Sequence, residues 1–211
     1  MIDHAILAPA TTPAQVRQGC ELAVRLGVAC VCVRPSDVAQ AVRLLAGSRV
    51  GVCTVIGFPH GSTTPAAKLA EAREALAAGA SELDMVINIG RLIAGEHGYV
   101  RDEIAAIVQA AAGRVVKVIL ECGCLQRPQM QAACGAALEA GAAFVKTSTG
   151  FGPRGATVED VQFLHQQVRG RAGVKASGGI HTAQQALAMI AAGASRLGLS
   201  RTEEILSQLE G

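Results

Sequence analysis

The sequence is poor in aromatic residues: its 211 residues include four Phe, one Tyr and no Trp. Proteins that hold single-stranded nucleic acid stack the bases on aromatic side chains, so this composition argues against such a partner. The net charge is +2 and there is no run of basic residues. Neither nucleic acid nor an anionic membrane surface is therefore predicted to bind.

The sequence also lacks an apolar run of about 18 residues, the length that a membrane-spanning helix needs. Its first ten residues, MIDHAILAPA, have neither the basic region nor the long apolar stretch of a signal peptide. The cysteines number seven, and no pair has the spacing of zinc ligands or of a thioredoxin motif. Cys30 and Cys32, and likewise Cys122 and Cys124, are interpreted as small buried residues. We therefore expect a cytoplasmic protein with reduced thiols and no metal site.

Lysine is scarce as well, because only four of the 19 basic residues are lysines. Three of the four lie in apolar, strand-like runs: Lys117 in VVKVIL, Lys146 in AFVKTST and Lys175 in GVKAS. A buried lysine can lose its proton, whereas arginine in effect cannot. A neutral amine can form a Schiff base with a carbonyl compound, so three such lysines favour an amine-based active site. The alternative is that each lysine snorkels or pairs with a carboxylate.

Short apolar runs alternate with longer Ala-rich amphipathic segments along the whole chain. The expected strands are 2–6, 29–33, 50–56, 82–88, 115–121, 143–148, 172–177 and 195–199. The expected helices are 12–26, 35–46, 64–78, 98–112, 128–140, 157–169, 182–192 and 202–209. Strands that alternate with helices form a parallel sheet, and eight such units predict a single (β/α)₈ barrel domain over residues 1–211. An open doubly wound sheet is the alternative.

One glycine motif in this order points to a different class of protein. Gly150, Gly152 and Gly155 spell G-x-G-x-x-G between a strand and a helix. A dinucleotide site requires an acidic residue about 20 positions later. That region holds Lys175 instead, and Pro153 stands where a backbone amide is needed. The segment is interpreted as a loop at the mouth of the barrel, and no cofactor is predicted.

Side chains alternate between the two faces of a strand, which determines which charged groups meet. If the faces that carry Asp84, Lys117, Lys146 and Lys175 point inward, these side chains converge inside the barrel, and Asp3 joins them from the first strand. Burial and neighbouring cations both lower the pKa of a lysine. One amine then becomes a neutral nucleophile while another stays charged as an acid. The alternative is an interior salt-bridge cluster that only fills the barrel.

A second site is predicted after the seventh and eighth strands, where barrels of this class usually bind phosphate. Small residues there let backbone amides approach an anion: Gly178, Gly179, Gly198 and Ser200. Arg201 and His181 lie beside them and add charge, or else are solvated residues at helix starts. His60, in the loop after the third strand, is interpreted as polar surface.

Together these motifs resemble those of the bacterial deoxyribose-phosphate aldolases over essentially the whole chain. The matching segments are IDH at 2–4, GFPHG at 57–61, ELDMVINIG at 82–90, VVKVILE at 115–121, FVKTSTGFGPRGATVEDV at 144–161 and VKASGGI at 174–180. The resemblance implies reversible, metal-free cleavage of 2-deoxy-D-ribose 5-phosphate to acetaldehyde and glyceraldehyde 3-phosphate. The expected partner is a small phosphosugar, and the expected assembly is a homodimer.

The resemblance also implies roles for individual residues. Lys146 matches the Schiff-base lysine, Lys175 the lysine that perturbs it, and Asp84 the acid that relays protons. Lys117 and Asp3 match supporting polar residues in the same pocket. The positions that match the phosphate loops are Gly178, Gly179, Gly198 and Ser200.

The chain departs from the family pattern at several positions. Ala5 and Ala8 stand where Thr and Lys are usual, and His181 stands where Arg is common. Arg201 replaces a small hydroxyl residue, and we expect it to compensate by contacting the phosphate. These departures leave two alternatives: a related Schiff-base aldolase for another phosphorylated substrate, and a non-enzymatic sugar-phosphate sensor. The retained lysines and Asp84 favour an enzyme.

Overall fold

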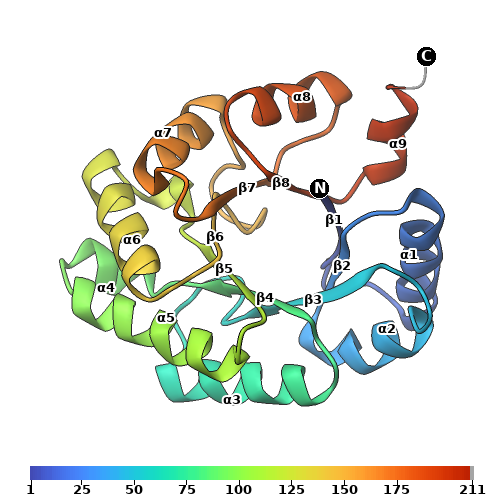
Figure 1. Ribbon diagram of the computed structural model, residues 1–211, viewed down its shortest axis with the longest axis horizontal. Helices are drawn as coiled ribbons and strands as arrows, with labels where there is room; N and C mark the ends of the chain where they lie inside the picture. Colours follow the sequence, from blue (N-terminus) through green and yellow to red (C-terminus); the bar gives the residue numbers. More distant parts are fainter. Residues whose placement is uncertain (210–211) are drawn as a thin grey trace.

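The computed structural model describes residues 1–209, and these form a closed barrel of eight parallel strands (Figure 1). The strands are β1 (Ile2–Ile6), β2 (Cys30–Val33), β3 (Gly51–Ile56), β4 (Glu82–Val86), β5 (Val115–Ile119), β6 (Phe144–Lys146), β7 (Gly173–Ser177) and β8 (Arg196–Leu199). Each strand pairs with the next, and β8 pairs with β1. The (β/α)₈ prediction is confirmed, and the open sheet is wrong. The end of the predicted domain, at residue 211, lies outside the described residues.

Helices form an outer ring around the strands (Figure 1). They are α1 (Pro13–Leu26), α2 (Val38–Leu44), α3 (Pro65–Ala77), α4 (Ile89–Ile93), α5 (His97–Ala111), α6 (Arg127–Glu139), α7 (Val158–Val168), α8 (Ala183–Ala191) and α9 (Thr202–Ser207). The predicted helices correspond to eight of these, and α4 was missed because five residues show no helical period. Within residues 1–209, no helix has the length and apolar character that crossing a membrane requires.

Threonine fixes the start of several outer helices. Thr12, Thr64, Thr157 and Thr182 are N-caps, and each hydroxyl accepts a hydrogen bond from a backbone N–H three residues later. Such a cap satisfies a donor that the first helical turn leaves free. Each of these helices follows a loop that leaves the C-terminal end of a strand. The caps therefore also fix where those four loops end.

A buried ion pair joins the helix layer to the barrel on one side. Lys68 of α3 and Glu103 of α5 are almost inaccessible, and the Lys68 Nζ lies 2.8 Å from the Glu103 Oε2. The same ammonium donates to the Val86 carbonyl at 2.8 Å, while the Glu103 Oε1 accepts from the Asn88 backbone N–H at 2.6 Å. Burial lowers the pKa of Lys68 and raises that of Glu103. The pair thus anchors the chain where it leaves β4.

Replacing Lys68 by Met should destabilise the protein strongly, because it leaves the Glu103 carboxyl buried without its partner. Loss of one member of a buried pair costs about 3–5 kcal/mol. Urea denaturation followed by far-UV circular dichroism measures the change in free energy of unfolding. Arg91→Met is the matched control, since it breaks an ion pair with Glu96 whose side chains are 50% and 42% exposed. Equal effects of the two substitutions would contradict this account.

Candidate active site

The inside of the barrel is charged. Asp3, Asp84, Lys117 and Lys175 are at most 1% exposed, and Lys146 is 3% exposed. A barrel interior is ordinarily filled by Val, Ile and Leu, so this cluster is costly to bury and calls for a functional explanation. The structure brings together all five side chains that the alternation along the strands predicted to meet.

Asp84 lies at the centre of the cluster. Its Oδ2 accepts hydrogen bonds from the Nζ atoms of Lys146 and Lys175, each at 2.7 Å. Its Oδ1 accepts one from the Nζ of Lys117 at 2.7 Å and one from the Cys53 thiol at 3.1 Å. Burial raises the pKa of this carboxyl, but the three neighbouring lysines, Lys117 first among them, outweigh burial and hold the pKa well below its ordinary value. Asp84 is therefore a carboxylate at any ordinary pH.

Asp3 and two residues that were not predicted extend the cluster toward the N-terminal ends of the strands. The Asp3 Oδ2 accepts from Lys175 at 2.5 Å, and its Oδ1 accepts from Arg196 at 2.6 Å. The Glu82 Oε2 lies 2.6 Å from the Lys117 Nζ and 3.5 Å from Arg196. Alternation was the available signal, because Glu82 precedes Asp84 by two residues and Arg196 precedes Gly198 by two.

The lysines differ in how firmly they hold their protons. Burial lowers the pKa of Lys175, but Asp84 and Asp3 more than offset this and raise it above its ordinary value. The same balance between burial and carboxylates raises the pKa of Lys117. Both therefore remain ammonium groups. Lys146 has a single carboxylate partner among the described residues, Asp84, whereas Lys117 contacts three and Lys175 two.

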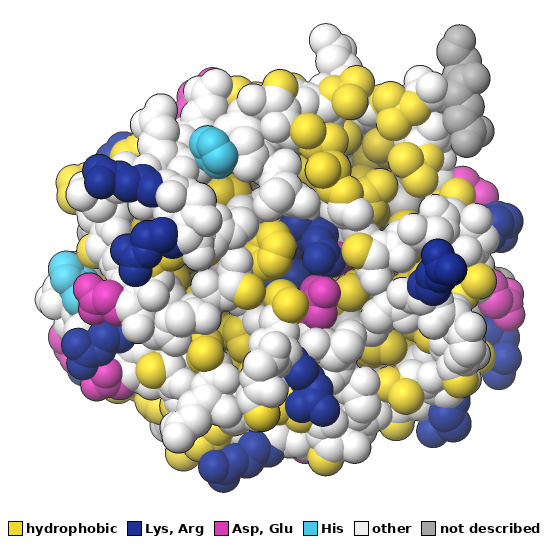
Figure 2. Space-filling view, in the orientation of Figure 1, with side chains coloured by type: hydrophobic (Ala, Val, Ile, Leu, Met, Phe, Trp, Pro, Cys, Tyr) yellow, Lys and Arg dark blue, Asp and Glu magenta, His cyan; other side chains and the backbone are white. Residues whose placement is uncertain are grey.

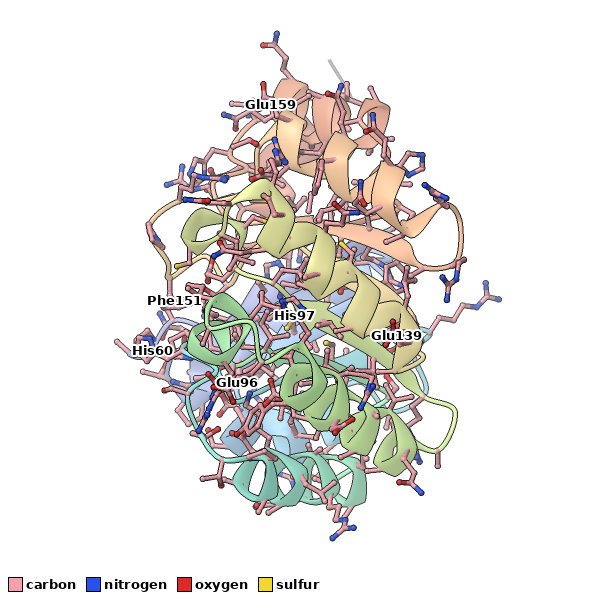
Figure 3. The ribbon with its side chains drawn as sticks, turned by 90° about the vertical axis from the view of Figure 1, so that its left-hand side faces the viewer. His60, Glu96, His97, Glu139, Phe151 and Glu159 are labelled. Carbon is pink, nitrogen blue, oxygen red and sulfur yellow. The ribbon has the colours of Figure 1, made fainter. Side chains whose placement is uncertain are left out.

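A cavity of about 760 Å³ opens above the cluster at the C-terminal ends of the strands. Asp3, Lys146 and Lys175 form its floor. Its walls include Thr149, Gly150, Phe151, Ser177, Gly178, Gly179, His181, Gly198 and Ser200. Figure 3 shows His60 and Phe151 together at this end of the molecule, on the loops after β3 and β6. His60 is exposed and does not line the cavity.

Two of the predicted phosphate residues lie elsewhere than expected. Arg201 does not line the cavity: its guanidinium lies 3.7 Å from Glu204, and its side chain is 56% exposed. It precedes α9 and turns along the first turn of that helix toward the carboxylate. Gly198 lies within β8 rather than in the loop that follows. A Cβ there would lie 3.2 Å from the Lys175 Cε, so this glycine also makes room for the lysine.

The glycines of the β6–α7 loop pack against the β7–α8 loop. A Cβ on Gly155 would lie 2.2 Å from the Gly178 carbonyl oxygen, and one on Gly178 would lie 3.1 Å from the Cα atoms of Gly150 and Gly155. The Ala156 N–H donates to the Gly178 carbonyl at 3.0 Å. The G-x-G-x-x-G segment is thus a loop at the barrel mouth, as predicted, and its glycines allow two backbones to touch.

Cysteine thiols lie among the charged groups inside the barrel, which their spacing in the sequence did not indicate. Cys32, Cys53 and Asp84 place potential metal-ligating atoms within 4.8 Å of one another, and so do Asp3, Cys53 and Glu82. A metal ion at either place would have to displace ammonium groups from the carboxylates. It would also need thiolates, whereas burial raises the pKa of Cys53 well above its ordinary value. The donor set therefore fits a metal poorly.

Comparison with known proteins gives consistent matches over the full barrel. A family model described as DeoC/LacD family aldolase matches residues 1–202. The deoxyribose-phosphate aldolase of Trichormus variabilis is 51% identical over 98% of this chain and 91% of its own. That of Enterococcus faecalis is 49% identical over 100% of this chain and 96% of its own. The tetrameric deoxyribose phosphate aldolase of Aeropyrum pernix superposes with a TM-score of 0.93 at 34% identity, covering 100% and 89% of the two chains.

Substituting Gly178 by Ala should abolish the binding of inorganic phosphate at the cavity. The residue has a φ of +83°, and an added Cβ would press on the β6–α7 loop, so both loops must shift. Phosphate binding by the parent protein and the variant is compared by isothermal calorimetry. Arg201→Ser is the control and should bind phosphate like the parent, because Arg201 faces away from the cavity. A loss of binding in the control alone would reverse the assignment.

Proposed function

The chain belongs to the DeoC/LacD family of aldolases, and from this premise we propose that it reversibly cleaves 2-deoxy-D-ribose 5-phosphate to acetaldehyde and D-glyceraldehyde 3-phosphate. The relatives that carry this name are about half identical and cover nearly all of the chain. The observation that carries the chemistry is the position of Lys146. Its amine lies on the cavity floor and donates a hydrogen bond to one carboxylate, that of Asp84, which also accepts one from Lys175.

Lys146 is the nucleophile of the proposed reaction. Its neutral amine adds to the aldehyde carbon of the open-chain sugar, and loss of water gives an iminium. The C2–C3 bond then breaks as the C3 hydroxyl loses its proton, and the bonding electrons move into the iminium to form an enamine. Glyceraldehyde 3-phosphate leaves at this point. Protonation of the enamine carbon and hydrolysis then release acetaldehyde and free the amine.

Asp84 and Lys175 move and hold the protons in this sequence. Lys175 keeps its proton because its pKa is raised, so it can donate when the carbinolamine loses water and when the enamine carbon is protonated. Asp84 stays ionised, orients both amines and accepts protons back through the network. The iminium is itself the electron sink, so the reaction requires no metal ion.

We propose that the phosphate lies against the β7–α8 loop, which forms one wall of the cavity. Gly178 and Gly179 both have positive φ angles and line the cavity beside His181 and Ser200. Backbone amides at the start of a helix attract an anion. Because Arg201 faces solvent, it does not compensate for the departures from the family pattern, and another phosphorylated aldehyde or ketone is the alternative substrate.

The setting of the enzyme is also part of the proposal. We propose a homodimer, and the exposed Leu187 and Leu209 side chains, 51% and 50% accessible, are consistent with an interface. All seven cysteines are free, and six are buried, as suits a reducing cytoplasm.

An aldol cleavage assay tests the proposed activity directly. The purified protein should release acetaldehyde from 2-deoxyribose 5-phosphate, and turnover should be much slower with unphosphorylated deoxyribose because the phosphate contacts are lost. Prolonged incubation with a chelator should leave both rates unchanged. Activity that is lost on chelation and restored by zinc would indicate a metal-enolate mechanism instead.

Borohydride reduction tests the nucleophile. With acetaldehyde present, it should leave an ethyl group on Lys146, because reduction of the iminium makes the adduct permanent, and peptide mass spectrometry locates the modification. Lys146→Arg should form no adduct and show no activity, since its guanidinium stays protonated. An adduct found solely on Lys117 or Lys175 would refute the assignment.

A further inference from the structure

The charged groups inside the barrel form a closed ring of ion pairs from which Lys146 stands apart. Three cations alternate with three carboxylates: Lys117, Asp84, Lys175, Asp3, Arg196 and Glu82. Every cation of the ring contacts at least two of the carboxylates, and every carboxylate contacts at least two of the cations. Lys146 touches the ring only at Asp84.

The ring is electrically neutral without Lys146. Asp84 and Asp3 have lowered pKa values, because their cationic neighbours outweigh the effect of burial, so both remain carboxylates. Lys117 and Lys175 remain ammonium groups, and Arg196 cannot lose its charge. A proton on Lys146 would add a fourth cation to three carboxylates at the buried floor of the cavity. The charge balance therefore favours a neutral amine at that one position.

Three thiols also face this interior, and the titratable groups on the cavity wall include His4 and His181. Burial raises the pKa of Cys30 to about 12, and burial raises that of Cys53 well above its ordinary value, so both are neutral. A hydrogen bond with Cys53 lowers the pKa of Cys32, which lines the cavity. Cys32 would enter a pH titration beside the amine, so it has to be removed from any test of the charge balance.

We propose that Arg196 and Glu82 are positioning residues that act through the ring on the protonation of Lys146, an inference that rests on the proposed Schiff-base function. Arg196 favours the neutral amine, and Glu82 balances the charge of Arg196. Neither residue lines the cavity. Their side chains are 15% and 13% exposed at the beginnings of β8 and β4, at the end of the barrel away from the substrate. Figure 2 views the end opposite the His60 and Phe151 loops, and basic and acidic side chains are visible at its centre.

The two residues act in opposite directions, which makes the proposal testable. Arg196→Gln removes a cation, so the interior favours a proton on Lys146, and the acidic limb of the kcat/KM profile against pH should move to higher pH. Glu82→Gln removes a carboxylate, so the same limb should move to lower pH. A unit charge about 10 Å away at an effective dielectric constant of about 20 corresponds to a shift of about one pH unit. Both changes are made in a Cys32→Ala background.

Two control variants separate charge from packing. Arg196→Lys keeps the charge and should restore the parent profile. The double variant Glu82→Gln with Arg196→Gln keeps the ring neutral and should return the midpoint close to that of the parent. A structural defect alone would lower kcat in both single variants without moving the midpoints apart. If Arg196→Gln does not fold, as judged by far-UV circular dichroism, the sign of the Glu82→Gln shift decides the question.

The outcomes distinguish this inference from the function on which it rests. If borohydride traps no adduct on Lys146 in the parent protein, the proposed function and the inference fail together. If the adduct forms but the two midpoints shift in the same direction, or neither shifts, the aldolase assignment stands and the role of Arg196 and Glu82 is refuted.

Discussion

The contact on which this molecule depends is that of one buried carboxylate with three amines. Asp84 has no exposed surface, and it accepts hydrogen bonds from Lys117, Lys146 and Lys175. An isolated charge in such a place would be very unfavourable, and it becomes tolerable only because opposite charges surround it. The arrangement ties β4 to β5, β6 and β7 through side chains as well as through backbone pairing. It also makes the protonation of each amine depend on the others.

The barrel provides a reason for this arrangement. Eight strands, each contributing inward side chains, surround a space too narrow for water to enter freely, and the register of the strands sets neighbouring side chains at the same height. Asp84 pairs in register with Lys117, and Lys146 with Lys175. Paired strands of this kind keep a reactive amine both away from water and fixed in direction. Loops alone would hold it less rigidly.

Much of the charged cluster inside the barrel could be predicted from the sequence, because the alternation of side chains along a strand is a strictly local rule. It placed Asp3, Asp84 and the three lysines inside the barrel without any coordinates. The same rule also applies to Arg196, two residues before Gly198, but alternation gives no sign of the ion pair between Arg196 and Asp3, which lie at opposite ends of the chain. The direction of Arg201 was unpredictable in principle, since an exposed side chain chooses among nearby partners and Glu204 lay within reach.

The contact between Gly155 and Gly178 has a consequence for altering this enzyme. Because the two backbones touch, the β6–α7 loop, which continues from the strand of Lys146, and the β7–α8 loop cannot move independently of each other. Redesign for uncharged aldehydes cannot reshape one loop and leave the other alone. The wall around His181 and Ser200 lies outside this contact and belongs to the same cavity. Selectivity is most freely changed there, where new side chains leave the position of the amine undisturbed.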